Sequence, residues 1–157
     1  MEVRTILWPT DLSKNSLKAA KHVVSLASKY QAKVILLYVG VDLMSFFPAY
    51  GSYPSEEQLH HFQDWEVKHA KKKLETVCDK DLKACPNVAI RLVQGDAAQE
   101  ILKAVKKEKA DMVVLTTHGR GHEKEQIDQV SPAFGSVAEK VIRNAPVPVH
   151  LVNPFRK

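Results

Sequence analysis

The sequence predicts an α/β domain with a five-stranded parallel sheet, doubly wound in the Rossmann-like manner, with helices on both faces. First, apolar runs and amphipathic stretches alternate four times, and a fifth apolar run follows near the carboxyl end. Second, the run KVILLYV from Lys33 to Val39 is almost uninterrupted, which is typical of a strand covered on both faces. Third, the 157 residues suit one domain, residues 1–157, with a core of its own.

Each apolar run is bounded by polar or turn-forming residues, which set the expected limits of the five strands. These limits are 3–8, 33–39, 88–93, 111–117 and 147–152. Pro9 is expected to end the first strand, because proline has no N–H group to donate. Right-handed crossovers between parallel strands would place the helices on the two faces of the sheet.

Four amphipathic stretches are expected to form helices. Residues that cap helices mark the first three starts, namely Asp11 or Ser13, then Ser55 with Gln58 as a capping box, and then Asp96. The fourth helix covers 136–144. The second helix is expected to bury one apolar stripe, made of Leu59, Phe62, Trp65, His69, Leu74, Val77 and Leu82.

Composition narrows the classes of function. No apolar run approaches the roughly 20 residues that span a bilayer, and the opening MEVRTILWPTDLS is not expected to act as a signal peptide, because its apolar stretch is short. We therefore expect a cytoplasmic protein without a membrane partner, in which Cys78 and Cys85 are free thiols. The net charge of +5 comes with lysines spread over predicted helix faces, so no nucleic acid partner is expected.

Candidate ligand-binding residues follow the first and fourth strands, because ligands of open parallel sheets bind beyond the carboxyl ends of the strands. Pro9, Thr10 and Asp11 follow the first strand. The Asp11 carboxylate either accepts hydrogen bonds from a ligand's amine and hydroxyl groups or only caps the first helix. The fourth strand leads into TTHGRG, from Thr116 to Gly121, where two glycines let the backbone approach a ligand closely.

Gly135 and Ser136 open the fourth helix. The free N–H groups and partial positive charge of a helix N-terminus suit a phosphate, and the Ser136 hydroxyl can donate as well. Alternatively, Ser136 and Glu139 form a plain capping box, and Gly135 only gives a tight entry to the helix.

Several segments together resemble the universal stress protein family. They are DMVVLTTHGRG and GSVAEKVIRNAPVPVHLV near the carboxyl end, with ILWPTDLSKNSLKAAKHVVSLA, KVILLYV and QGDAAQEILKAVKKEKADMVVL before them. The resemblance covers essentially the whole chain. It implies a doubly wound five-stranded parallel sheet of the adenine nucleotide alpha hydrolase-like type, commonly dimeric, with one branch that binds ATP, for which Mg²⁺ is a candidate companion.

The resemblance also implies roles for residues at matching positions. Asp11 and Val39 would meet the adenine and its surroundings. The ribose and phosphates would be surrounded by Thr116, Gly119, Arg120, Gly135 and Ser136, with backbone N–H groups of Val137 and Ala138. The full predicted nucleotide site is Pro9, Thr10, Asp11, Val39, Leu115, Thr116, His118, Gly119, Arg120, Gly135, Ser136, Val137 and Ala138.

Two features depart from the ATP-binding pattern. Thr116 replaces the first glycine of the Gly-x-x-Gly turn, and fifteen residues separate Gly119 from Gly135 where the pattern has nine. The extra residues include Glu123, Glu125 and Asp128. These carboxylates would repel a triphosphate if the segment folds over the pocket, and would matter little if it loops outward.

The leading prediction is a stress-response protein that binds ATP or another adenine nucleotide as a regulatory ligand. The alternative is an interaction module that has lost nucleotide binding and forms a homodimer through the last strand, Val147 to Val152. Enzymatic activity is not expected beyond a weak ATPase, since His118 is the one candidate general base near the turn. His118, His122 and Glu123 are not expected to bind a metal.

Overall fold

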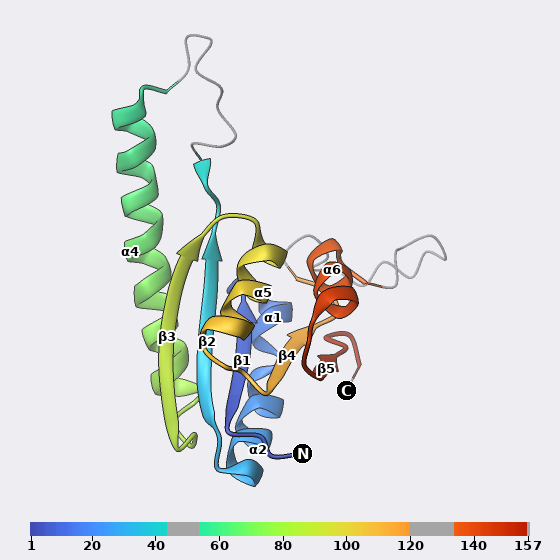
Figure 1. Ribbon diagram of the computed structural model, residues 1–157. Coiled ribbons are helices and arrows are strands. Elements are labelled where there is room, and N and C mark those ends of the chain that lie inside the picture. Colours follow the sequence, from blue (N-terminus) through green and yellow to red (C-terminus); the bar gives the residue numbers. More distant parts are fainter. Residues whose placement is uncertain (44–53, 120–133, 157) are drawn as a thin grey trace.

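The computed structural model describes residues 1–43, 54–119 and 134–156, and these form one parallel sheet of five strands in the order β3-β2-β1-β4-β5 (Figure 1). The strands are β1 Thr5–Thr10, β2 Lys33–Gly40, β3 Asn87–Gln94, β4 Met112–Thr116 and β5 Val149–Val152. The predicted fold class is confirmed. The last strand is shorter than expected because it begins after Pro148, whose carbonyl accepts a hydrogen bond from Val113 N (3.0 Å).

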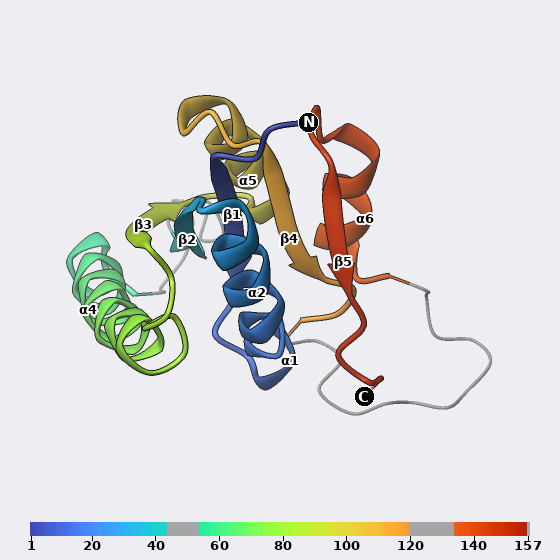
Figure 2. The ribbon, with the colours of Figure 1, turned by 90° about the horizontal axis from the view of Figure 1, so that it is seen from below.

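Helices cover both faces of the sheet (Figure 2). One face carries α1 (Lys14–Leu17), α2 (Ala20–Tyr30) and α4 (Glu56–Lys80), and the other carries α5 (Ala97–Lys107) and α6 (Ser136–Asn144). Side chains of the central strands alternate between the two resulting cores. In β1, Ile6 and Trp8 pack under α2 and α4, while Leu7 packs under α5 and α6, and all three are fully buried.

Strand β1 does not stop at Pro9, as the sequence predicted, but continues to Thr10. Its pairing with β4 covers only Ile6 and Leu7, whereas its pairing with β2 runs through Pro9 and Thr10. Proline is tolerated there because one neighbour of β1 no longer pairs at that level, so the missing N–H group interrupts no ladder on that side.

The first predicted helix consists of two parts, α1 and α2, separated by Lys18 and Ala19. Ser13 is the cap of α1, and its hydroxyl accepts a hydrogen bond from Ser16 N (3.2 Å). The predicted caps of α4 and α5 are confirmed, since the Ser55–Gln58 capping box and the Asp96 cap both form.

Helix α4 departs from its predicted stripe. Phe62 and Trp65 are 53% and 52% exposed, and they stack on each other with ring centroids 5.9 Å apart. At 3.6 residues per turn, Trp65 lies about 120° around the helix from Leu59, whereas Gln63 and Ala70 lie within about 40° of it. The buried face therefore runs through Leu59, Gln63, Ala70, Leu74 and Val77.

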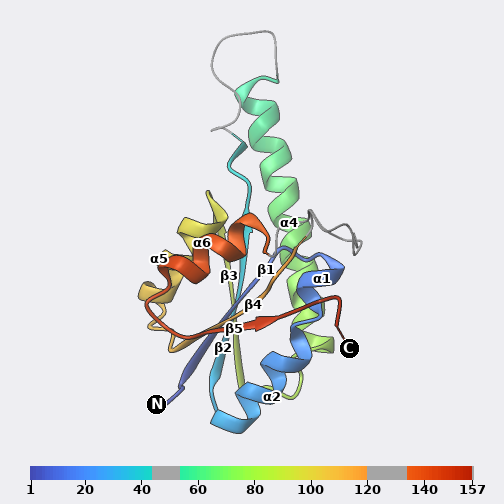
Figure 3. The same cartoon turned by 90° about the vertical axis from the view of Figure 1, so that its right-hand side faces the viewer.

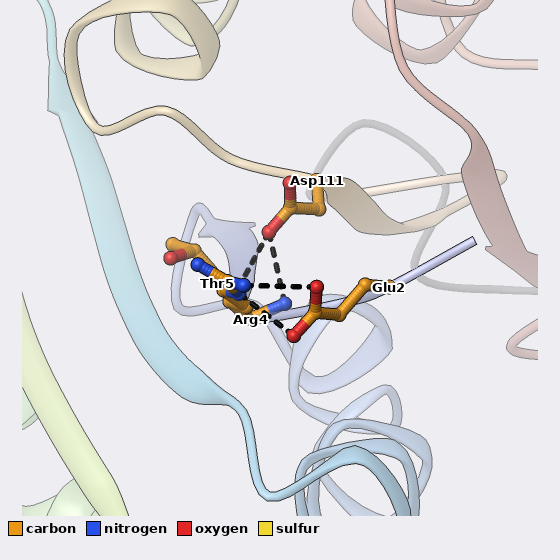
Figure 4. Close-up of polar contacts among 4 residues, drawn as sticks. All are labelled: Glu2, Arg4, Thr5 and Asp111. Carbon is orange, nitrogen blue, oxygen red and sulfur yellow. Dashed lines mark hydrogen bonds and ion pairs between the residues drawn. The ribbon is translucent and has the colours of Figure 1, made fainter.

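Asp111 fixes the edge of the sheet opposite the carboxyl ends of the strands. Its Oδ2 atom accepts hydrogen bonds from the backbone N–H groups of Arg4 and Thr5, both at 2.9 Å (Figure 4). The Arg4 side chain pairs with Glu2 at 2.8 Å on the surface. Asp111 thus aligns the starts of β1 and β4.

None of the helices in the described ranges is long and apolar enough to span a membrane.

Candidate functional site

The candidate site lies where the chain order of the strands reverses. From β1 the chain leads outward to β2 and β3 on one side, while β4 and β5 lie on the other side. Such a switch point leaves a crevice beyond the carboxyl ends of the two central strands. A cavity of about 270 Å³ occupies this crevice. Its lining consists of Pro9, Thr10, Asp11, Ser16, Val39, Ala97, Ile101, Leu115, Thr116, Thr117, Gly119, Gly135, Ser136, Val137 and Ala138.

One wall of the cavity is apolar and comes from the α5 and α6 side of the sheet. Val39 at the end of β2 and Leu115 in β4 belong to the core on that side, together with Ile101 of α5 and Val137 of α6. Leu115 and Ile101 are buried, and Val39 and Val137 are half-buried. A flat apolar group such as an aromatic base would find contacts on this wall.

The opposite wall is polar and is held by a tight turn after β1. The hydroxyl groups of Thr10 and Ser16 share a hydrogen bond of 2.7 Å, and Thr10 Oγ1 also accepts one from Leu12 N at 3.0 Å. Leu12 has a positive φ of 62°, a conformation that non-glycine residues adopt rarely. These bonds hold Thr10 and Leu12 in place, and they thereby fix the backbone position of Asp11 in the cavity wall.

Asp11 is fixed from two sides. Its Oδ1 atom accepts a hydrogen bond from Ser13 N at 2.9 Å, so the residue supports the start of α1 even though Ser13 is the cap. On the other side Gly119 packs directly against the carboxylate: a Cβ atom at this glycine would lie 2.5 Å from Asp11 Oδ2. The carboxylate also lines the cavity, so support of the helix and contact with a ligand are compatible roles.

Helix α6 begins at the cavity and is tied to β4. Gly135 N donates to the Thr117 carbonyl at 2.8 Å, and Thr117 N donates to the Val152 carbonyl at 3.0 Å. Among the described residues no side chain caps α6, so the alternative of a Ser136–Glu139 capping box is wrong. Gly135 is the cap instead, and Glu139 pairs with Arg143 at 2.9 Å. Within the described residues, the first turn of α6 therefore borders the cavity without a side-chain cap.

The remaining predicted residues fall into three groups. Val137 and Ala138 line the cavity, as do Pro9 and Thr10. His118 is not part of the lining formed by the described residues: its Nδ1 atom lies 3.0 Å from Thr117 Oγ1, and its ring lies 5.4 Å from that of Phe155. Arg120, His122, Glu123 and the rest of 120–133 lie outside the described residues.

Four lining residues were missing from the predicted site: Ser16, Ala97, Ile101 and Thr117. Ala97 and Ile101 belong to the first turns of α5, which follows β3 after a short turn at Gly95 and Asp96. Because this helix starts at the carboxyl edge of the sheet, its first turns border the crevice. The signal that would have pointed to them is the position of these residues directly after a strand.

The order of the strands and the place of the crevice define a doubly wound, Rossmann-like α/β protein. The sequence profile of the universal stress protein family matches residues 2–153. The chain therefore belongs to the universal stress protein family, as its sequence segments indicated. A universal stress protein of Methanocaldococcus jannaschii, MJ0531, is 34% identical over 156 residues, which cover 98% of this chain and 84% of that protein.

Solved structures agree with this assignment. The structure of protein MJ0577 of the same organism has a TM-score of 0.80 and 28% identity, and the match covers 100% of this chain and 99% of that one. A universal stress protein solved in complex with cAMP has a TM-score of 0.67 and 19% identity, with 98% and 99% of the two chains covered. The latter likeness concerns the fold alone.

Proposed function

We propose that the cavity between β1 and β4 binds an adenine nucleotide. The observation that carries the proposal is the joint placement of an apolar wall, a fixed carboxylate at Asp11 and the N-terminus of α6, which no described side chain caps, around one crevice. These three features correspond to the three parts of a nucleotide, namely the base, the hydroxyl-bearing sugar and the phosphate.

In the proposed complex the base lies against Val39 and Leu115. The Asp11 carboxylate accepts hydrogen bonds from amine or hydroxyl groups of the nucleoside, because an ionised carboxylate is an acceptor only. The phosphate lies at the first turn of α6, where the Ser136 hydroxyl and the N–H groups of Val137 and Ala138 are available.

Relatives with the same fold support an adenine ligand. Besides the structure with cAMP, a universal stress protein of Archaeoglobus fulgidus was solved with dAMP and one of Arabidopsis thaliana with AMP. The substitution of Thr116 for glycine is compatible with the proposal, because Thr116 is 7% exposed at the end of β4 and most of its side chain is covered by the protein.

We propose further that ATP is one of the nucleotides bound. The cavity of about 270 Å³ is close to the lower end of the roughly 300–1,000 Å³ that is usual for ligand sites. A nucleoside with its first phosphate would occupy it, and further phosphates would extend past α6. Mg²⁺ would then be held mainly by the phosphates, since the described ranges contain no group of three His, Cys, Asp or Glu suited to a metal.

We propose a regulatory rather than a catalytic use of the nucleotide. His118, the candidate general base, contacts Thr117 and Phe155 and is absent from the described lining of the cavity. A general base needs to reach the attacking water within hydrogen-bonding distance. The test is an assay of phosphate release from ATP at protein concentrations of tens of micromolar. Release by the unmodified protein that is lost in Asp11→Ala would contradict the proposed regulatory use.

Thermal unfolding with AMP, ADP and ATP, each with and without Mg²⁺, tests binding. At 100 times its dissociation constant a ligand adds about 2.7 kcal/mol to the stability of the folded state. For a domain of this size that raises the midpoint by roughly 5–11 °C. No shift with any of the three nucleotides at millimolar concentration would overturn the proposal and favour the alternative of an interaction module.

The variant Ser136→Glu tests where the phosphate lies. A carboxylate in the first turn of α6 interacts favourably with the helix dipole and so should not weaken the fold, but it repels a phosphate. We expect the thermal shift with AMP to fall by more than half. Ser25→Glu is the matched control, since it adds the same charge at an exposed position of α2. A full shift in Ser136→Glu would place the phosphate elsewhere.

We also propose that two copies pair through β5. Within the described residues β5 is an edge strand, bonded to β4 alone, and the exposed Pro146 and Pro148 precede it. Antiparallel pairing with a second copy would cover both edges. Light scattering after gel filtration should give twice the mass of one chain, and Val149→Arg should give the mass of one. A single-chain mass for the unmodified protein at 50 μM would overturn this proposal.

A further inference from the structure

Two histidines far apart in the sequence meet on the face of the sheet that α1 and α2 cover. His22 of α2 and His150 of β5 are separated by 128 residues, yet His150 Nε2 and His22 Nδ1 lie 3.3 Å apart. Their ring centroids are 5.4 Å apart and the ring planes are inclined by 46°. Figure 3 shows β5 running between helices α5 and α6 on one side and helices α1 and α2 on the other. Neither histidine lines the cavity between β1 and β4.

The spacing of the two nitrogen atoms matches that of two imidazoles on one metal ion. Zinc–nitrogen bonds are about 2.0–2.1 Å long, and at a tetrahedral angle of about 109° two such nitrogens stand roughly 3.3–3.4 Å apart. In the hydrogen-bonded pair one of the facing nitrogens carries a proton. If that proton sits on the other nitrogen of the same ring, both facing nitrogens present lone pairs, and a small rotation of the rings directs them at one point.

The pair is partly open to solvent. Both side chains are half-buried, so water has access and can fill the remaining coordination positions.

The charges around the pair limit which ion fits. Lys21 directly precedes His22 on α2, and the ammonium group of Lys18, one turn earlier, donates to the Pro154 carbonyl at 2.6 Å. The parts of the chain that the structure describes bring no third His, Cys, Asp or Glu into a metal-binding group here. Hard ions such as Mg²⁺ and Ca²⁺, which need several oxygen ligands, do not suit the pair, whereas ions that prefer imidazole do.

We propose that His22 and His150 form a two-imidazole binding site for a divalent ion of the late first-row transition metals, with Zn²⁺ as the best geometric match. The bound ion would link helix α2 to the edge strand β5 directly. Because the unfolded chain does not hold the two rings together, binding would stabilise the folded state. The site is independent of the proposed nucleotide site.

The test is a titration of the full chain with ZnCl₂ at pH 7.5 without nucleotide, followed by calorimetry and by thermal unfolding. The variants His22→Gln and His150→Gln each remove one ligand, and Gln can still form a hydrogen bond to the remaining ring. His60→Gln, an exposed position on α4, is the matched control. Loss of even an outer-shell contact costs about 10–100-fold in metal affinity, so we expect at least a tenfold loss in each of the two variants and none in the control.

Two results would overturn the proposal. One is the absence of Zn²⁺ binding by the unmodified protein at concentrations up to 1 mM. The other is equal affinity of the unmodified protein and of both His22→Gln and His150→Gln, which would place any bound zinc on other histidines. A second readout guards against unfolded variants: the C2–H proton resonances of the two histidines should broaden or shift with less than one equivalent of Zn²⁺, before those of other histidines respond.

Discussion

Gly119→Ala is the substitution for which the structure gives the sharpest expectation. The added Cβ atom would stand 2.5 Å from Asp11 Oδ2 and 3.4 Å from Asp11 Cγ. Ordinary van der Waals contact begins at 3.4 Å, so the first separation is too short by about 1 Å. Asp11 is the group that has to move, because the glycine belongs to the backbone of the turn after β4. Its carboxylate would withdraw from Ser13 N, to which it is bonded at 2.9 Å.

The magnitude follows from two opposing terms. A hydrogen bond to a charged acceptor contributes about 1.5–3 kcal/mol, and most of it is lost if the Asp11 carboxylate turns away from Ser13. Alanine in place of glycine restricts the unfolded chain and returns about 0.4–1 kcal/mol. We therefore expect a net loss of about 1–2 kcal/mol, which for a domain of this size lowers the midpoint of thermal unfolding by roughly 2–8 °C.

A double-mutant cycle isolates this contact. Urea unfolding is measured for the unmodified protein, Gly119→Ala, Asp11→Ala and the double variant. Gly119→Ala should cost about 1 kcal/mol less when the carboxylate is already absent. Gly40→Ala is the control, since its Cβ atom would find its nearest neighbour, Gln94 Cγ, at an ordinary 3.5 Å. If Gly119→Ala costs as much without Asp11 as with it, the contact is not the cause and the reasoning fails.

Three further predictions concern elements away from the cavity. Asp111→Ala leaves two backbone N–H groups at the start of β1 without their acceptor and should cost about 1–3 kcal/mol in urea unfolding, while Asp111→Asn should cost less. Ser55→Ala removes the capping box of α4 and should cost about 1 kcal/mol, visible as a midpoint lower by roughly 2–4 °C; no change would contradict the cap. Bonding to Arg91 lowers the pKa of Glu108, so the stabilisation is complete above pH 4.5 and is lost as the pH falls through the lowered value. Glu108→Gln should therefore cost about 1 kcal/mol at pH 7 and progressively less below pH 4.5, and a cost independent of pH would contradict this assignment.

The fold followed from the sequence because its determinants are local and repeated. Alternating apolar runs and amphipathic stretches identify strands and helices. Right-handed crossovers between parallel strands then place the helices on the two faces of the sheet. Pro9 was misjudged because the effect of a proline depends on which neighbouring strand pairs at that level, and that is a property of the assembled sheet. Phe62 and Trp65 were misjudged because steps of three residues drift around the helix by about 60° each.

The candidate site was predicted in part. Asp11, Gly119, Gly135 and Ser136 follow the first and fourth strands, and the carboxyl ends of adjacent parallel strands meet at one edge. Ile101 was missed because its apolar side chain matches the buried stripe of a helix, and its position in the first turns after a strand was not used as a signal. The structure therefore brings most of the predicted site residues together around one cavity, whereas their binding of a nucleotide stays a prediction.

Gly119 and Gly135 do not support ligand binding equally. Close approach of a ligand is the usual explanation for glycines in such turns, but the contact with Asp11 already requires glycine at 119, with or without a ligand. At Gly135 a Cβ atom would have its nearest neighbour, the Thr117 carbonyl, at 3.4 Å, so packing tolerates a side chain there. What lacks a structural explanation is the first turn of α6, which no described side chain caps although it is part of the cavity wall. N–H groups at the wall of a crevice can donate either to water or to an anion. The variant Ser136→Glu distinguishes the two, because its carboxylate repels an anion and has no such effect on water.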